Sequence, residues 1–116
     1  MSSKSLEERV ELLEYYNVLM RDFAVDPETY VLWDYIMSEH LNGAQGNQLL
    51  EVLKNHYTKL KIALEKEERL PGTSYLYEDL INVVKSFGKP ASERTAYSIL
   101  LRASKLPEFH LYSKYL

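Results

Sequence analysis

The side chains that could bind a metal ion are scattered along this sequence of 116 residues. The three histidines, His40, His56 and His110, lie in different segments, and no two of them are four residues apart. The chain contains no cysteine, which removes thiolate chemistry and the commonest zinc ligands. We therefore expect no metal and no cofactor, and we interpret His56, which falls on an apolar helix stripe, as a buried, hydrogen-bonded histidine.

Acidic and hydroxyl side chains give no clearer indication of catalysis. Glutamates are frequent at residues 7–14 and 65–68, but they fall on polar helix faces. General acid–base catalysis would require two carboxylates that converge in a cleft. The serines do not lie in a GxSxG elbow, and no glycine-rich loop could hold a phosphate. We therefore expect that this protein is not an enzyme.

The positive charge is concentrated at the C-terminal end of the chain. Residues 1–53 carry ten acidic and three basic side chains, whereas residues 85–116 carry six basic and two acidic ones. A basic end on a chain of net charge −3 suits an anionic partner, such as a phospholipid surface, a nucleic acid or an acidic protein. The alternative is that both ends are simply solvated.

The elements that must position these groups are helices, because apolar residues recur at spacings of three and four in five segments. The segments are separated by turn signals at Asp26-Pro27, Asn42-Gly43, Leu70-Pro71-Gly72 and Gly88-Lys89-Pro90. We predict one all-α domain over residues 1–116, an antiparallel four-helix bundle with a short fifth helix and a C-terminal aromatic tail. The predicted helices span about 5–24, 27–41, 45–69, 74–87 and 90–105, and the tail spans 106–116.

Local signals add detail to the first two helices. Ser5 and Glu8 have the spacing of a capping box at the start of the first helix. Asn42-Gly43 is predicted to end the second helix, because both residues tolerate a left-handed cap. The first helix carries apolar residues at spacings of four and three, which we expect to face the core: Leu6, Val10, Leu13, Tyr16, Met20 and Phe23.

The C-terminal tail is unusually apolar for a chain end. Its apolar residues include Phe109, Leu111, Tyr112, Tyr115 and Leu116. A disordered end would be poor in aromatic residues. The tail therefore either folds back on the bundle as a clamp or is exposed for a partner.

The N-terminus carries acidic residues where a signal peptide would need an apolar stretch. No stretch approaches the ~18 consecutive apolar residues of a membrane span. We expect a soluble, cytoplasmic protein, with a peripheral position at the inner face of the membrane as a further option.

Taken in order, these features resemble the immunity proteins of pediocin-like (class IIa) bacteriocins, of the enterocin A and carnobacteriocin B2 immunity type. The resemblance rests on the end of the first helix at Tyr15-Tyr16-Asn17-Val18-Leu19, on Asp26-Pro27, and on a long third helix that ends in charged residues before Leu70-Pro71. A Leu106-Pro107 step then leads into the aromatic terminus. The chain departs from the family in its extended third helix and its long C-terminal end.

The resemblance implies a non-enzymatic, monomeric four-helix bundle that protects a bacteriocin producer. Such proteins act at the cytoplasmic side of the mannose phosphotransferase permease to which the bacteriocin is bound. Family specificity lies in the C-terminal half, which favours the fifth helix and the tail, while Trp33 is expected to be structural. The expected partner-binding residues are Arg94, Arg102, Lys105, Phe109, Tyr112, Lys114 and Tyr115.

Two other classes of function fit the same residues. A helical protein–protein adaptor or small regulator would leave an apolar stripe uncovered, and a stable dimer would favour it over an immunity protein. A DNA-binding regulator would show salt-dependent binding. Nucleic-acid binding is not expected, because the chain is net acidic; its candidate contacts would be Lys85, Lys89, Arg94 and Arg102.

Overall fold

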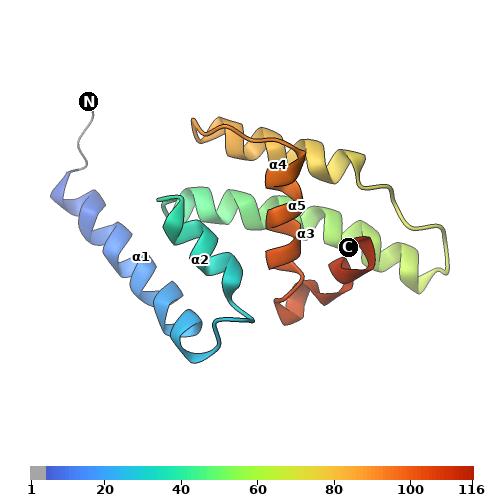
Figure 1. Cartoon of the computed structure of the whole chain (residues 1–116), viewed down its shortest axis with the longest axis horizontal. Helices are drawn as coiled ribbons and strands as arrows, with labels where there is room; N and C mark the ends of the chain where they lie inside the picture. The colour runs from blue at the N-terminus through green and yellow to red at the C-terminus, as the bar shows by residue number, and fades with distance from the viewer. Residues whose placement is uncertain (1–4) are drawn as a thin grey trace.

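The computed structural model describes residues 5–116, and over this range the regular structure is entirely helical (Figure 1). This confirms the all-α prediction. The elements in chain order are α1 (Leu6–Val25), α2 (Val31–Ser38), α3 (Gly43–Glu65), α4 (Ser74–Ser86), α5 (Glu93–Ala103) and the 3₁₀ helix η1 (Pro107–Tyr115).

The helices form two hairpins and a crossing segment. In Figure 1, α1 runs against α2 and α3 runs against α4, while α5 crosses the second hairpin steeply. α5 packs on α4 and α2, and η1 packs on α3 and α5. α1 packs mainly on α2 and lies at one side of an elongated molecule of 51 × 32 × 20 Å.

Side-chain hydrogen bonds fasten α1 to its neighbours. The indole N–H of Trp33 donates to the Asp22 carboxylate at 3.1 Å, and the Tyr16 hydroxyl donates to the Leu41 carbonyl at 2.8 Å. Trp33 also packs against the hydrophobic core. It therefore has the structural position expected from the sequence.

Two helices end earlier than their sequence signals indicate. α2 ends at Ser38 and α3 at Glu65, and each is followed by a non-glycine residue with positive φ, His40 (58°) and Glu67 (55°). Backbone bonds from Leu41 N to Ile36 O (3.0 Å) and from Glu68 N to Ala63 O (2.9 Å) close Schellman motifs around them. These bonds satisfy carbonyls that a helix end would otherwise leave without partners.

The Asn42-Gly43 pair begins a helix and does not end one. The Asn42 side chain accepts from Gln45 N at 2.9 Å, and the Gln45 side chain accepts from Asn42 N at 2.9 Å. This reciprocal pair is a capping box. The prediction that Asn42-Gly43 terminates the second helix was wrong, because asparagine suits an N-cap as well as a left-handed C-cap.

The second helix also begins later than expected. Residues 27–30 form a turn, and α2 starts at Val31. Asp26 nevertheless accepts from the Thr29 amide at 3.2 Å and from its hydroxyl at 2.6 Å. At the start of α1, Ser5 Oγ accepts from Glu8 N at 3.1 Å as the capping-box pattern predicts.

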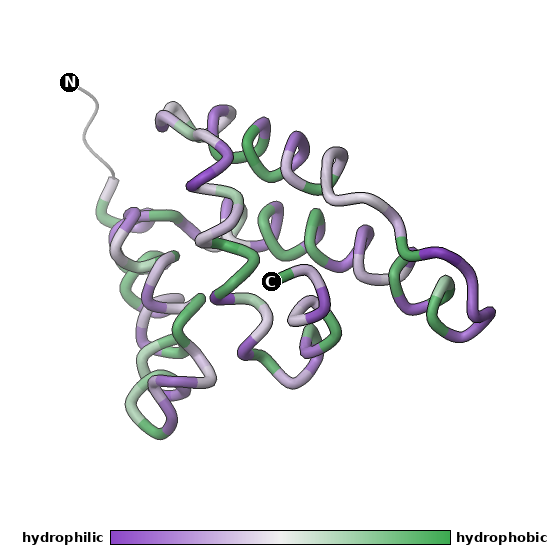
Figure 2. The backbone as a smooth tube through the Cα atoms, turned by 45° about the vertical axis from the view of Figure 1, so that its right-hand side comes forward, coloured by the Kyte–Doolittle hydropathy of each residue, from purple (hydrophilic) through white to green (hydrophobic). Residues whose placement is uncertain are grey.

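The core lies between α2, α3, α4, α5 and η1. Hydrophobic residues recur along every helix, as Figure 2 shows. α1 contributes one buried residue to the core, Leu19, and Tyr15 and Tyr16 are half-buried against the core. The prediction for the inward face of α1 was wrong in part, because Leu6, Val10, Leu13 and Met20 are exposed.

Candidate functional site

The tail folds back on the helices, which decides between the two alternatives left open by its composition. Phe109 is 2% exposed and Tyr112 is 0% exposed, and both belong to the hydrophobic core. Tyr115 is half-buried, and its hydroxyl donates to the Pro71 carbonyl at 2.8 Å. Three of the seven expected partner-binding residues therefore hold the tail in place, and Phe109 and Tyr112 are not available on the surface.

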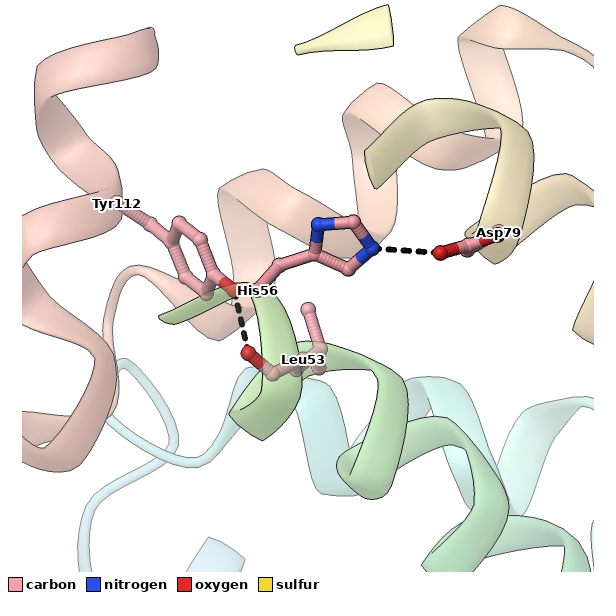
Figure 3. Close-up of polar contacts among 4 residues, drawn as sticks. All are labelled: Leu53, His56, Asp79 and Tyr112. Atoms are coloured by element: carbon pink, nitrogen blue, oxygen red, sulfur yellow. Dashed lines mark hydrogen bonds and ion pairs between the residues drawn. The ribbon is translucent and has the colours of Figure 1, made fainter. Parts of the chain in front are cut away.

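Tyr112 is the centre of this attachment (Figure 3). Its hydroxyl donates to the backbone carbonyl of Leu53 in α3. Its ring meets the Tyr57 ring edge-on at a centroid distance of 5.1 Å, and Phe109 meets the same ring at 5.4 Å. Edge-to-face contacts of this kind stabilise aromatic clusters beyond their buried area. Burial raises the pKa of the Tyr112 phenol far above its ordinary value, because a phenolate would be poorly solvated there.

The Tyr57 hydroxyl extends the same attachment by accepting from the Leu111 amide at 3.3 Å. Tyr57 lies on α3, half-buried. One aromatic residue of α3 thus contacts both the rings and the backbone of η1.

His56 forms the second polar contact drawn in Figure 3. Its Nε2 lies 2.6 Å from the Asp79 carboxylate, which joins α3 to α4. The His56 side chain is 14% exposed and that of Asp79 is 53% exposed. The prediction that His56 is hydrogen-bonded is confirmed, but the prediction that it is buried was wrong, because its side chain lies half-buried at the edge of the core beside the exposed Asp79.

Arg102 is a half-buried cation on α5. Its Nη1 donates to Ser98 Oγ, and its guanidinium carbon lies 5.7 Å from the centre of the Tyr35 ring. The Nε atom is buried and has no hydrogen-bond partner. The Arg102 guanidinium therefore makes a cation–π contact with Tyr35 of α2, and only part of it is accessible to a partner.

Arg102 lies in a cleft of about 440 Å³ that also contains Arg94 and Lys89. Arg94 is exposed at the start of α5, and Lys89 Nζ lies 3.8 Å from Glu39 in the neighbouring wall. The cleft thus gathers three cations and one carboxylate, which leaves an excess of positive charge. Its remaining lining is small or weakly polar: Tyr35, Val84, Pro90, Ser92, Thr95 and Ser98.

The other two expected cations do not join this cleft. Lys105 is exposed and lines a separate cleft of about 440 Å³ with Phe23, Pro27 and Val31. Lys114 is exposed on η1. Of the four nominated cations, only Arg94 and Arg102 lie in the same cleft, while the three nominated aromatic residues pack together inside the tail attachment.

Sequence reasoning missed an exposed apolar stripe on α1. Leu6 is 75% exposed, Leu13 is 68%, Met20 is 54% and Val10 is 44%. These residues lie on one helix face because they follow spacings of four, three and seven. The signal was present in the sequence: α1 also carries Leu12, Tyr15, Tyr16 and Leu19, a second apolar face. One helix cannot bury two such faces against a single neighbour.

Residues 5–116 contain neither a metal-binding cluster nor a membrane-spanning helix. No group of three histidine, aspartate or glutamate side chains in this range could hold a metal ion. No helix in the same range has the length and apolar character needed to cross a membrane.

Within residues 5–116, the cationic cleft and the α1 stripe are two surface features suited to contact with a partner. Comparison with protein-family models, with curated proteins and with solved structures finds no match to the chain.

Proposed function

We propose that this protein is a non-enzymatic binding protein whose cationic cleft docks on an acidic target surface. The observation that carries the proposal is the cleft itself, where Lys89, Arg94 and Arg102 meet with one carboxylate among them. Three cations against one carboxylate leave an excess of positive charge in the cleft, and such an excess raises the local concentration of oppositely charged partners. The exposed position of Arg94 makes it the residue best suited to direct contact.

The biological role that we propose is the one implied by the sequence resemblance. The chain would act as a pediocin-like bacteriocin immunity protein at the cytoplasmic side of the toxin-bound mannose permease. In this proposal α1 to α4 are the four helices of the bundle and α5 is the added fifth helix. The excess of positive charge at the C-terminal end supports it, because the inner membrane leaflet is anionic.

Survival of a bacteriocin-sensitive strain tests this role directly. We expect the wild-type chain to protect against at least one peptide of a pediocin-like panel. Arg94→Glu should reduce protection, whereas Lys59→Glu, the same charge change at an exposed position of α3, should not. Both variants should keep the wild-type thermal midpoint, because exposed charges contribute little to stability. Full protection by Arg94→Glu would exclude the cleft as the docking surface.

Arg102 is unsuited to the same charge-reversal test. A glutamate there would lose the contact with Tyr35 and would face Glu39 across the cleft. We therefore expect Arg102→Glu to lower stability as well as binding. This differs from a purely exposed charge, for which binding alone should change.

The second candidate is a helical adaptor, and the exposed stripe on α1 favours it. Contiguous exposed apolar surface marks interaction sites in soluble proteins. Light scattering distinguishes the two candidates in part, because a stable dimer favours the adaptor.

A DNA-binding role predicts retention on heparin at low salt, and the absence of retention would count against that role.

A further inference from the structure

The exposed stripe on α1 has the spacing of a coiled-coil seam. In a heptad register, Leu6, Leu13 and Met20 occupy d positions. Val10, Asn17 and Ala24 occupy the a positions of the same face. All six are exposed, and the seam runs along the whole helix, about 30 Å at 1.5 Å per residue.

We propose that this face binds a second copy of the same chain, and that the two α1 helices pair in parallel as a two-stranded coiled coil. β-Branched Val at a with Leu at d favours two strands. A single asparagine at an a position favours a parallel dimer, because Asn17 then lies against Asn17 of the other copy. In the antiparallel alternative, Asn17 would lie against Leu13 and lose its polar partner.

Charge complementarity at the flanks supports the parallel pairing. Arg9 occupies a g position and Glu14 the following e position, so each Arg9 would face Glu14 of the other copy. Neither residue has an oppositely charged side chain three or four positions away in its own helix. The two therefore lack an intrahelical partner and are complementary only across the seam.

The position of α1 in the fold also suits such an interface. Its other face is held by the Trp33–Asp22 bond to α2 and by the bond from Tyr16 to the Leu41 carbonyl between α2 and α3, so the helix is formed before association. Dimerisation therefore does not have to offset the free-energy cost of helix nucleation. That cost makes short isolated helices only marginally stable in water. The helix lies at the side of the molecule in Figure 1, where a second copy can reach it.

The first test is the oligomeric state of the full chain, measured by sedimentation over a range of concentrations. We expect a concentration-dependent dimer. Leu13→Glu should give a monomer with unchanged helix content, because Leu13 is 68% exposed and contributes little to the core. Lys59→Glu on α3 is the matched control and should leave the dimer intact. A wild-type chain that stays monomeric up to millimolar concentration would overturn the proposal, and a dimer that survives Leu13→Glu would too.

The second test uses charge exchange between copies. Arg9→Glu alone and Glu14→Arg alone should each weaken self-association about tenfold, because two attractive pairs become repulsive. An equal mixture of the two variants should recover the affinity, since a mixed dimer places the two introduced side chains, one acidic and one basic, opposite each other. Failure to recover would exclude the parallel register.

The absence of cysteine permits a direct test of direction. Ala24→Cys should form a disulfide-linked dimer under mild oxidation, because residues of the same layer are adjacent in a parallel pair. In an antiparallel pair the two positions would lie about 27 Å apart at 1.5 Å per residue, and no cross-link would form. A dimer without this cross-link would overturn the parallel arrangement.

This inference does not rest on the proposed function. The seam on α1 and the cationic cleft use different helices, so the variants of one leave the other unchanged. A dimer would favour the adaptor candidate, and the survival assay with Arg94→Glu would still test immunity independently.

Discussion

The hydroxyl of Tyr112 donates a hydrogen bond to the backbone carbonyl of Leu53, 59 residues earlier in the chain. This bond joins the last helix of the chain to the middle of α3. Because Tyr112 is fully buried, the C-terminal segment is part of the core and not an appendage of it. The segment cannot be removed without exposing Leu53 and its neighbours to water.

Substitution of Tyr112 should separate the contribution of its hydrogen bond from that of its ring. Tyr112→Phe should lower the free energy of unfolding by about 1 kcal/mol, because it removes one hydrogen bond. Tyr112→Ala should lower it by about 3–5 kcal/mol, because it also leaves a cavity. Urea unfolding followed by circular dichroism measures both values, and Lys114→Ala, at an exposed position of η1, is the control.

Deletion of residues 106–116 should lower the stability of the protein more than Tyr112→Ala does. The deletion removes three buried side chains, Leu106, Phe109 and Tyr112. We expect loss of the cooperative unfolding transition at 25 °C. A truncated chain that unfolds like the wild type would contradict the description of the tail as part of the core.

Alkaline pH should destabilise the fold, and Tyr112 should carry a measurable part of the effect. Burial raises the pKa of Tyr112 in the folded state, so the folded state holds this proton more tightly than the unfolded state. Its contribution to stability is therefore complete below the unfolded pKa of about 10 and is lost as the pH rises through the folded value.

Unfolding free energies measured between pH 8 and pH 11.5 test this expectation. The wild type should lose stability above about pH 10. Tyr112→Phe should lose it less steeply, with a residual slope from tyrosines such as Tyr15 and Tyr35, whose pKa values burial also raises. Equal slopes in the two proteins would show that Tyr112 does not titrate with unfolding.

The helix ends offer a stabilising substitution. Glu67 is exposed and has a φ of 55°, a conformation that costs a non-glycine residue about 1–2 kcal/mol. Glu67→Gly should therefore raise the free energy of unfolding by about 1 kcal/mol. Gly88 provides the opposite control: its φ is 81° and the space around its Cα is open, so Gly88→Ala should lower stability through backbone strain alone. Thermal unfolding of the two variants should show shifts of opposite sign.

Gly46 of α3 is a close-packing position. A Cβ added there would lie 3.1 Å from Cζ of Tyr15 and nearer still to its hydroxyl. Gly46→Ala should therefore cost about 1–3 kcal/mol in overpacking, which outweighs the gain of about 1 kcal/mol in helix propensity. The double variant with Tyr15→Leu should recover most of the loss, since the ring that obstructs the methyl group is gone.

Gly72 is the matched control for that experiment. No atom lies within 4 Å of a Cβ added at this position, so Gly72→Ala should not destabilise the protein. If Gly46→Ala were as stable as Gly72→Ala, Tyr15 would have to move freely away from α3. That outcome would contradict the tight contact between α1 and α3.

The sequence was sufficient for those features that depend on neighbours in the chain. Spacings of three and four predicted five helices, and the tail's aromatic content indicated that it would pack either on the bundle or on a partner, a choice that only the structure decided. The position of Gly88 after α4 also followed from local rules, because glycine alone adopts its backbone conformation without strain.

Periodicity shows that a helix has an apolar face, but α1 has two, and only the position of α2 decides which one is buried. His40 and Glu67 adopt left-handed conformations within Schellman motifs. No signal in the sequence predicts these motifs, because neither position is a glycine. Phe109 and Tyr112 were nominated for a partner because the family resemblance places specificity in the C-terminal half of the chain. Their burial depends on contacts with α3 more than fifty residues away, and such contacts exist only in the folded chain.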